Sequence, residues 1–169
     1  GHLSHFGRPP STVLWCSTKP GNLSDNPALC VNHGAAFNAG RFQWPANAMT
    51  AIPGPDRPFV VAWTAPVSGV FGVTGGLSPN DVLGGNGVTW SLDVGTTTLA
   101  SGGYGSFGSK AFSAGVGGGS LSEISMNAGQ TQSLLVAPLG ESPDALPRAN
   151  FRLHQGLPPA SPPPGPAAP

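Results

Sequence analysis

The chain has 169 residues, which is enough for one domain with flanking segments. Only 8% of the residues are charged, and seven Lys+Arg balance seven Asp+Glu, so the formal net charge is zero. A neutral chain with scattered basic residues lacks the positive surface that nucleic acid or an anionic membrane would attract. The longest apolar runs are far shorter than the roughly 18 residues of a membrane span, so the sequence predicts none.

Residues 1–45 are predicted to form an irregular N-terminal arm, because the stretch 19–27 is dense in turn-forming residues. The arm contains both cysteines of the chain, Cys16 and Cys30. We expect them to form a disulfide that closes a loop of about 15 residues and stabilises the fold by roughly 3 kcal/mol. The alternative is two free thiols in a reducing compartment.

Residues 46–153 are predicted to fold as an all-β domain, a β-sandwich of jelly-roll-like form. Its clearest signal is residues 88–94, where Val88, Trp90, Leu92 and Val94 alternate with polar residues. This period of two is typical of a strand with one buried face, so these four side chains are expected in the core.

Other strands of the predicted sandwich are short and separated by glycines. The apolar strand at 59–63 is expected to form a hairpin with 70–73, and a long polar loop should follow at 75–87. Further strands are expected at 97–100, 110–113, 121–126, 133–137 and 150–153. Their spacing predicts at least seven strands between 58 and 153, and no helix longer than two turns.

Two loops of this domain contain candidate ligand-binding residues. Asp81 and Asn86 lie in the 75–87 loop and are candidate Ca²⁺ ligands, because hard cations are held by several oxygens. The alternative is that both residues cap turns on the surface. The glycine-rich segment 115–119 has no following Lys, so it is predicted to be a hairpin loop and not a phosphate-binding loop.

The C-terminal segment 154–169 is a proline-rich tail. Proline lacks a backbone donor and fixes φ, so the tail is predicted to be polyproline II or to have no regular structure.

Several stretches of the central domain carry a resemblance to a known family. They are Val61-Ala-Trp-Thr-Ala-Pro-Val-Ser-Gly-Val70, Gly87-Val-Thr-Trp-Ser-Leu-Asp-Val94, Thr98-Leu-Ala-Ser101 and Asn127-Ala-Gly129. The sequence resembles secreted bacterial β-sandwich modules of the carbohydrate-binding, galactose-binding-like type. The resemblance covers roughly residues 40–153 and implies a β-sandwich outside the cell, with no ligand-binding residue transferred from the family.

Aromatic side chains are the candidates for sugar binding, because a flat ring can stack on a sugar. Trp63 and Trp90 are in phase with aliphatic neighbours and are expected in the core. Trp44 and Tyr104 lie in loop-like sequence and are the better candidates for a sugar platform. The alternative for both is ordinary packing.

The sequence contains no catalytic motif, and neither a metal site nor a cofactor is expected. Its low charge and long terminal segments favour a non-catalytic extracellular structural subunit that assembles with copies of itself into a filament, sheath or matrix. In this interpretation the N-terminal arm pairs with a sheet edge of another copy, and the tail packs on a neighbouring surface. The alternative is a carbohydrate-binding accessory module of a secreted bacterial protein, whose partner is a polysaccharide.

Overall fold

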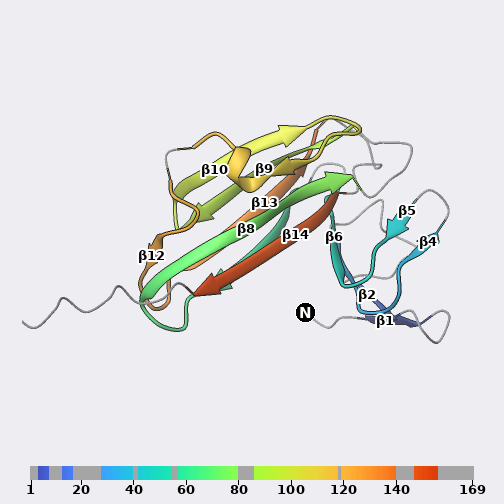
Figure 1. The fold of residues 1–169 in the computed structure, drawn as a ribbon, viewed down its shortest axis with the longest axis horizontal. Coiled ribbons are helices and arrows are strands. Elements are labelled where there is room, and N and C mark those ends of the chain that lie inside the picture. The colour runs from blue at the N-terminus through green and yellow to red at the C-terminus, as the bar shows by residue number, and fades with distance from the viewer. Residues whose placement is uncertain are drawn as a thin grey trace, which may run out of the picture.

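A computed structural model describes residues 4–7, 13–16, 28–39, 42–54, 57–79, 86–117, 119–139 and 147–155. These residues form an all-β fold of several antiparallel sheets, as the sequence predicts (Figure 1). The helical structure within them is a single 3₁₀ turn, η2 (Phe112–Ala114). Nowhere in this part of the chain is there a helix with the length and apolarity that crossing a membrane requires.

The larger sheet has eight strands, ordered β1-β2-β3-β6-β14-β8-β11, with β12 paired to β8 beside β11. Its strands are β1 (Ser4–Gly7), β2 (Val13–Cys16), β3 (Ala28–Asn32), β6 (Ala48–Ile52), β8 (Gly69–Pro79), β11 (Lys110–Ala111), β12 (Ile124–Met126) and β14 (Pro147–Gln155). The long strands β8 and β14 lie side by side (Figure 1), next to the β11 and β12 edge of this sheet.

The second sheet has four strands in the order β10-β9-β13-β7. They are β7 (Phe59–Thr64), β9 (Val88–Val94), β10 (Thr97–Tyr104) and β13 (Thr131–Pro138). A separate hairpin is formed by β4 (Phe37–Ala39) and β5 (Phe42–Trp44).

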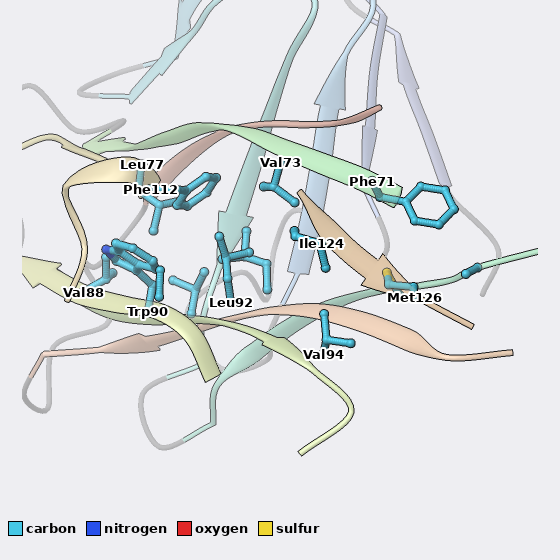
Figure 2. Packing of buried hydrophobic residues seen from close by; sticks show 14 of the residues in the cluster. Phe71, Val73, Leu77, Val88, Trp90, Leu92, Val94, Phe112, Ile124 and Met126 are labelled. Atoms are coloured by element: carbon cyan, nitrogen blue, oxygen red, sulfur yellow. The ribbon is translucent and has the colours of Figure 1, made fainter. Parts of the chain in front are cut away.

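The two large sheets enclose a common apolar core (Figure 2). From β9 come Val88, Trp90, Leu92 and Val94, all buried, which confirms the prediction for that strand. They face a set of buried side chains from the larger sheet and η2, namely Phe71, Val73, Leu77, Ile124, Met126 and Phe112 (Figure 2). The β-sandwich is therefore built on the alternation that is visible in the sequence.

Strand pairing differs from the prediction in one important respect. The segments 59–63 and 70–73 do not form a hairpin, because β7 pairs with β13 and β8 pairs with β14. The intervening residues 65–68 carry the chain from one sheet to the other. Likewise β8 continues to Pro79, so residues 75–79 are strand and not loop.

Most consecutive strands of the sandwich alternate between the two sheets. Of the connections from β6 to β14, two stay within one sheet. The β9–β10 hairpin stays in the four-stranded sheet, and the connection from β11 to β12 stays in the larger sheet. This alternation favours the jelly-roll form, which stays a prediction.

The N-terminal region contains regular structure that the sequence analysis did not expect. Within residues 1–45 the structure has five short strands, β1 to β5. The ladder β1-β2-β3-β6 joins the first three of them to the larger sheet. The segment was predicted to be irregular because its strands are only three to five residues long and are separated by turn formers.

The same ladder bears on the two cysteines. Cys16 lies directly opposite Cys30 in the β2–β3 register. Opposed residues of antiparallel strands have Cα atoms about 4.5–5.5 Å apart, which is within the range of a disulfide. Among the described residues no cysteine is a free thiol. The register therefore suits the Cys16–Cys30 bond, which stays a prediction.

Candidate functional site

The two residues predicted as a sugar platform are buried. Trp44 is 5% exposed and stacks on Phe37, with ring centroids 6.1 Å apart and planes 11° from parallel. Tyr104 is 9% exposed and belongs to the core cluster. Both lie in strands and not in loops, and neither presents a ring face on which a sugar could stack. The packing alternative is correct for both.

The tryptophans that were assigned to the core do pack there. Trp90 is buried and meets Phe112 edge-on, with centroids 5.2 Å apart. Trp63 is partly buried against the core and makes a similar contact with Phe71 at 5.1 Å. These side chains stabilise the sandwich and leave no exposed tryptophan face among the described side chains.

The candidate Ca²⁺ ligands are not brought together by described structure. Asp81 lies outside the described residues, and Asn86 is exposed just before Gly87. In the described part of the chain no three His, Cys, Asp or Glu side chains come close enough to hold a metal ion.

The outer face of the four-stranded sheet carries mainly small, uncharged side chains. Successive side chains of a strand point to opposite faces of the sheet. Since Leu92 and Leu134 point inward, Thr89, Ser91 and Asp93 of β9 and Ser133 of β13 point outward. Asp93 is the charged side chain of this face and accepts hydrogen bonds from the hydroxyls of Ser91 at 2.7 Å and Thr98 at 2.6 Å. Its carboxylate is therefore tied down by neighbours, and the surface has little charge to offer.

One edge of this sheet is covered by the chain itself. The glycine-rich segment 115–119 lies along β10, where Ser101 and Val116 exchange backbone hydrogen bonds of 2.8 Å. Glycine is required for this approach, because a Cβ at Gly117 would lie 2.2 Å from the Leu99 carbonyl oxygen, and one at Gly115 would lie 2.8 Å from the Ser101 carbonyl oxygen. The segment predicted as a simple hairpin loop thus protects an edge strand.

The opposite edge is β7, and no described strand pairs with its outer side. Its outward side chains are exposed and uncharged: Val60, Ala62 and Thr64. Val60 is 50% exposed, which is unusual for a valine in a strand. An uncharged apolar edge strand of this kind is a surface on which another strand can pair.

A half-open groove of about 420 Å³ lies between the two sheets, beside the glycine-rich segment. Its lining includes the apolar residues Val73 and Leu99 and the polar residues Thr74, Ser113 and Ser122. Its size and mixture of apolar walls with a few polar groups are within the range of small-molecule sites.

The sequence analysis missed Gln132, whose side chain lies in the core. It is 1% exposed, and neither its Oε1 nor its Nε2 has a hydrogen-bond partner. Register places it between Trp63 and Val94. The signal was present, because Gln132 is in phase with the inward residues Leu134 and Val136.

Replacing this glutamine tests that assignment. Gln132→Met is expected to raise the free energy of unfolding by about 1–2 kcal/mol, because it removes two buried polar atoms without hydrogen bonds and keeps the length of the side chain. Urea denaturation at neutral pH measures the change.

The matched control is Gln130→Met. The Gln130 Oε1 accepts a hydrogen bond of 2.8 Å from the Asn127 backbone N–H, so this variant should lose stability by up to about 1 kcal/mol. If Gln132→Met is destabilised as well, Gln132 is satisfied in solution and our assignment is wrong.

Comparison with protein-family models, with curated proteins and with solved structures finds no match to this chain. The resemblance to carbohydrate-binding modules therefore stays a prediction from short sequence stretches.

Proposed function

We propose that this protein is a non-catalytic structural subunit of an extracellular assembly and that its partners are copies of itself. The observation that carries the proposal is the scarcity of charge on the sandwich. Residues 46–153 contain ten charged residues, and only four of them, Asp81, Asp93, Lys110 and Glu123, lie between residues 59 and 139. A soluble monomer normally keeps its copies apart with a surface that is about 25–35% charged.

Apolar side chains exposed on the sandwich support the same proposal. Val60, Val67 and Leu139 are each close to half exposed, and Phe107 and Val116 are more exposed still. Scattered exposed apolar residues are common on monomers. Here they occur on a surface with almost no charge to oppose association.

The terminal segments are the proposed contacts between copies. Their expected role needs one revision, because β1 and β2 pair within their own sheet. Among the described strands β1 is the last of that sheet, so its outer side is the edge that the N-terminal segment can offer to a neighbour. The Cys16–Cys30 bond would hold β2 and β3 together beneath it, in keeping with an oxidising extracellular setting.

A carbohydrate-binding accessory module is the second candidate, and the groove between the sheets favours it. Its hydroxyls could bind sugar hydroxyl groups while Leu99 and Val73 cover apolar faces. Since the predicted aromatic platform is buried, such binding would depend on this groove.

Measuring the mass of the particles that the chain forms in solution tests whether it assembles with copies of itself. We expect the full chain to form particles whose mass rises with concentration, as seen by light scattering and negative-stain microscopy. Removing residues 1–14 or 157–169 is expected to yield smaller soluble species that still have a β circular dichroism spectrum. Each deletion removes a proposed contact, and the first removes only β1 and the start of β2 from the edge of the larger sheet.

Two results would oppose the proposal. Truncated chains that assemble as the full chain does would show that the terminal segments are not the contacts. A full chain that is monomeric at every concentration and binds glycans on an array would favour the accessory module.

A further inference from the structure

The exposed edge of β7 has a definite pattern of backbone donors and acceptors. Ala65 donates its N–H to Gln130 at 2.8 Å and accepts from Gly129 at 2.8 Å, so its backbone groups point toward β13. Backbone groups of an antiparallel strand point alternately to its two sides. The backbone N–H and C=O groups of Phe59, Val61 and Trp63 therefore point toward β13 as well.

It follows that Val60, Ala62 and Thr64 direct their N–H and C=O groups away from the sheet. None of the described strands pairs with these groups. The next positions in the same series are Pro58 and Pro66. Because proline has no N–H, the run of available donors begins at Val60 and ends at Thr64.

This edge is symmetric about Ala62. Pro58 and Pro66 are equally far from it on either side, and so are Val60 and Thr64. If two copies of β7 pair antiparallel about a two-fold axis at Ala62, Val60 of one copy lies opposite Thr64 of the other, and Ala62 lies opposite Ala62. Three such pairs exchange two bonds each, about six backbone hydrogen bonds in all.

We propose that β7 is a self-association edge, at which two copies join across a two-fold axis at Ala62 into one continuous sheet. This inference rests on the proposed function in that the partner is again the same chain. It adds a closed, two-fold contact to the proposed contacts of the terminal segments. If the terminal segments join copies head to tail into a filament, the two-fold contact joins one such filament to another.

A second copy fits this edge because, between the flanking prolines, no charge or bulge opposes pairing. Natural edge strands are usually protected by charged side chains, bulges or a covering segment. The sequence from Pro58 to Pro66 contains no charge, and its register with β13 is unbroken. The chain covers the β10 edge of the same sheet with residues 115–119 but leaves the β7 edge bare among its described strands.

The prolines limit the contact and do not prevent it. They confine pairing to the three positions from Val60 to Thr64, and thereby fix the register. An edge that was only to be blocked would need a proline or a charge at Ala62 itself. The contact is small, so we expect weak association that depends on concentration.

Charge placed at Ala62 tests the two-fold axis. In the paired edge the two Ala62 side chains face each other, so Ala62→Lys and Ala62→Glu each place like charges opposite one another. We expect each variant alone to weaken self-association at least tenfold and an equimolar mixture of the two to restore it. Sedimentation velocity of the full chain, from about 1 μM to about 1 mM, measures the effect.

Thr89→Lys is the matched control. Thr89 is exposed on the outer face of the same sheet, on β9 and away from the β7 edge, so the same charge there should leave association unchanged. All variants are checked by circular dichroism and thermal unfolding. Because Ala62 is exposed, both charged variants should fold.

The possible outcomes separate this inference from the proposed function. A full chain that associates equally well with Ala62→Lys overturns the β7 contact and leaves assembly through the terminal segments standing. A mixture that fails to restore association, or a Thr89→Lys variant as weak as Ala62→Lys, also overturns it. A chain that is monomeric up to 1 mM overturns both proposals.

Discussion

The substitution Asn32→Asp is expected to lower the free energy of unfolding by about 4 kcal/mol at neutral pH. Asn32 is 1% exposed at the end of β3. Its Nδ2 group donates to the carbonyl oxygens of Ala35, Trp44 and Pro45, each at 3.0 Å, while its Oδ1 accepts from the Gly34 N–H at 2.9 Å. Aspartate has the same shape but places a buried negative oxygen against three carbonyl oxygens.

The loss should depend on pH in a definite direction. Burial of a carboxyl oxygen against three carbonyl oxygens raises the pKa of the introduced carboxyl above the usual value of about 3.9, although its other oxygen keeps the Gly34 N–H as a donor. The penalty relative to the wild type is therefore small below about pH 4 and grows as the pH rises through the pKa in the folded state. Urea denaturation of both proteins across this range measures the difference.

Asn38→Asp is the matched control, because Asn38 is exposed on β4, in the β4–β5 hairpin that also contains Trp44. It should change stability by no more than about 0.5 kcal/mol. If Asn32→Asp does not fold at neutral pH, Asn32→Ala provides a milder test, with an expected loss of about 2–3 kcal/mol from unpaired carbonyl groups. Equal stability of the Asn32 and Asn38 variants would contradict the buried hydrogen bonds that we describe for Asn32.

Leu134→Ala is expected to lower the free energy of unfolding by about 2–5 kcal/mol, the usual cost of emptying a core position. Leu134 is fully buried, and β13 is a central strand whose register places Leu134 between Val61 of β7 and Leu92 of β9. The cavity would open between the two sheets, where rigid neighbours cannot close it.

Leu135→Ala supplies the control at the next position of the same strand. Leu135 points to the outer face and is only partly buried, so its loss should be about 1 kcal/mol or less. Chemical denaturation of the two variants measures their free energies of unfolding and so compares the inward and outward faces of β13. Equal losses, or a larger loss at Leu135, would show that the inward and outward assignment of β13 is wrong.

The sequence by itself determined the class of fold and the buried face of β9. Alternation at Val88, Trp90, Leu92 and Val94 is a local property, since successive side chains of a strand point to opposite faces. The same rule was sufficient to place Gln132 in the core, but a polar residue in that phase was overlooked. Glycine and proline density predicted no helix longer than two turns between residues 58 and 153, for equally local reasons.

Glycine gave a misleading signal where the reason for it was not local. Gly75 and Gly76 suggested a loop, yet β8 runs through them. A Cβ at Gly76 would lie 2.5 Å from the Lys110 carbonyl oxygen, so glycine is needed there for close approach to β11. A segment 34 residues away in the chain imposes that requirement, and no local pattern reports it.

Only the tertiary structure decided which strands are neighbours and which side chains are covered. β7 and β8 are adjacent in sequence but belong to different sheets, because the turn between them crosses the sandwich. Trp44 stacks on Phe37, and its carbonyl oxygen accepts a hydrogen bond from Asn32. Tyr104 belongs to the core cluster. Both residues are covered in this way, although their sequence context resembles that of exposed loops. Alternation specifies which face of a strand is apolar. Contacts between residues distant in the chain decide what covers that face, and they also decide which edge is left unpaired at Val60–Thr64.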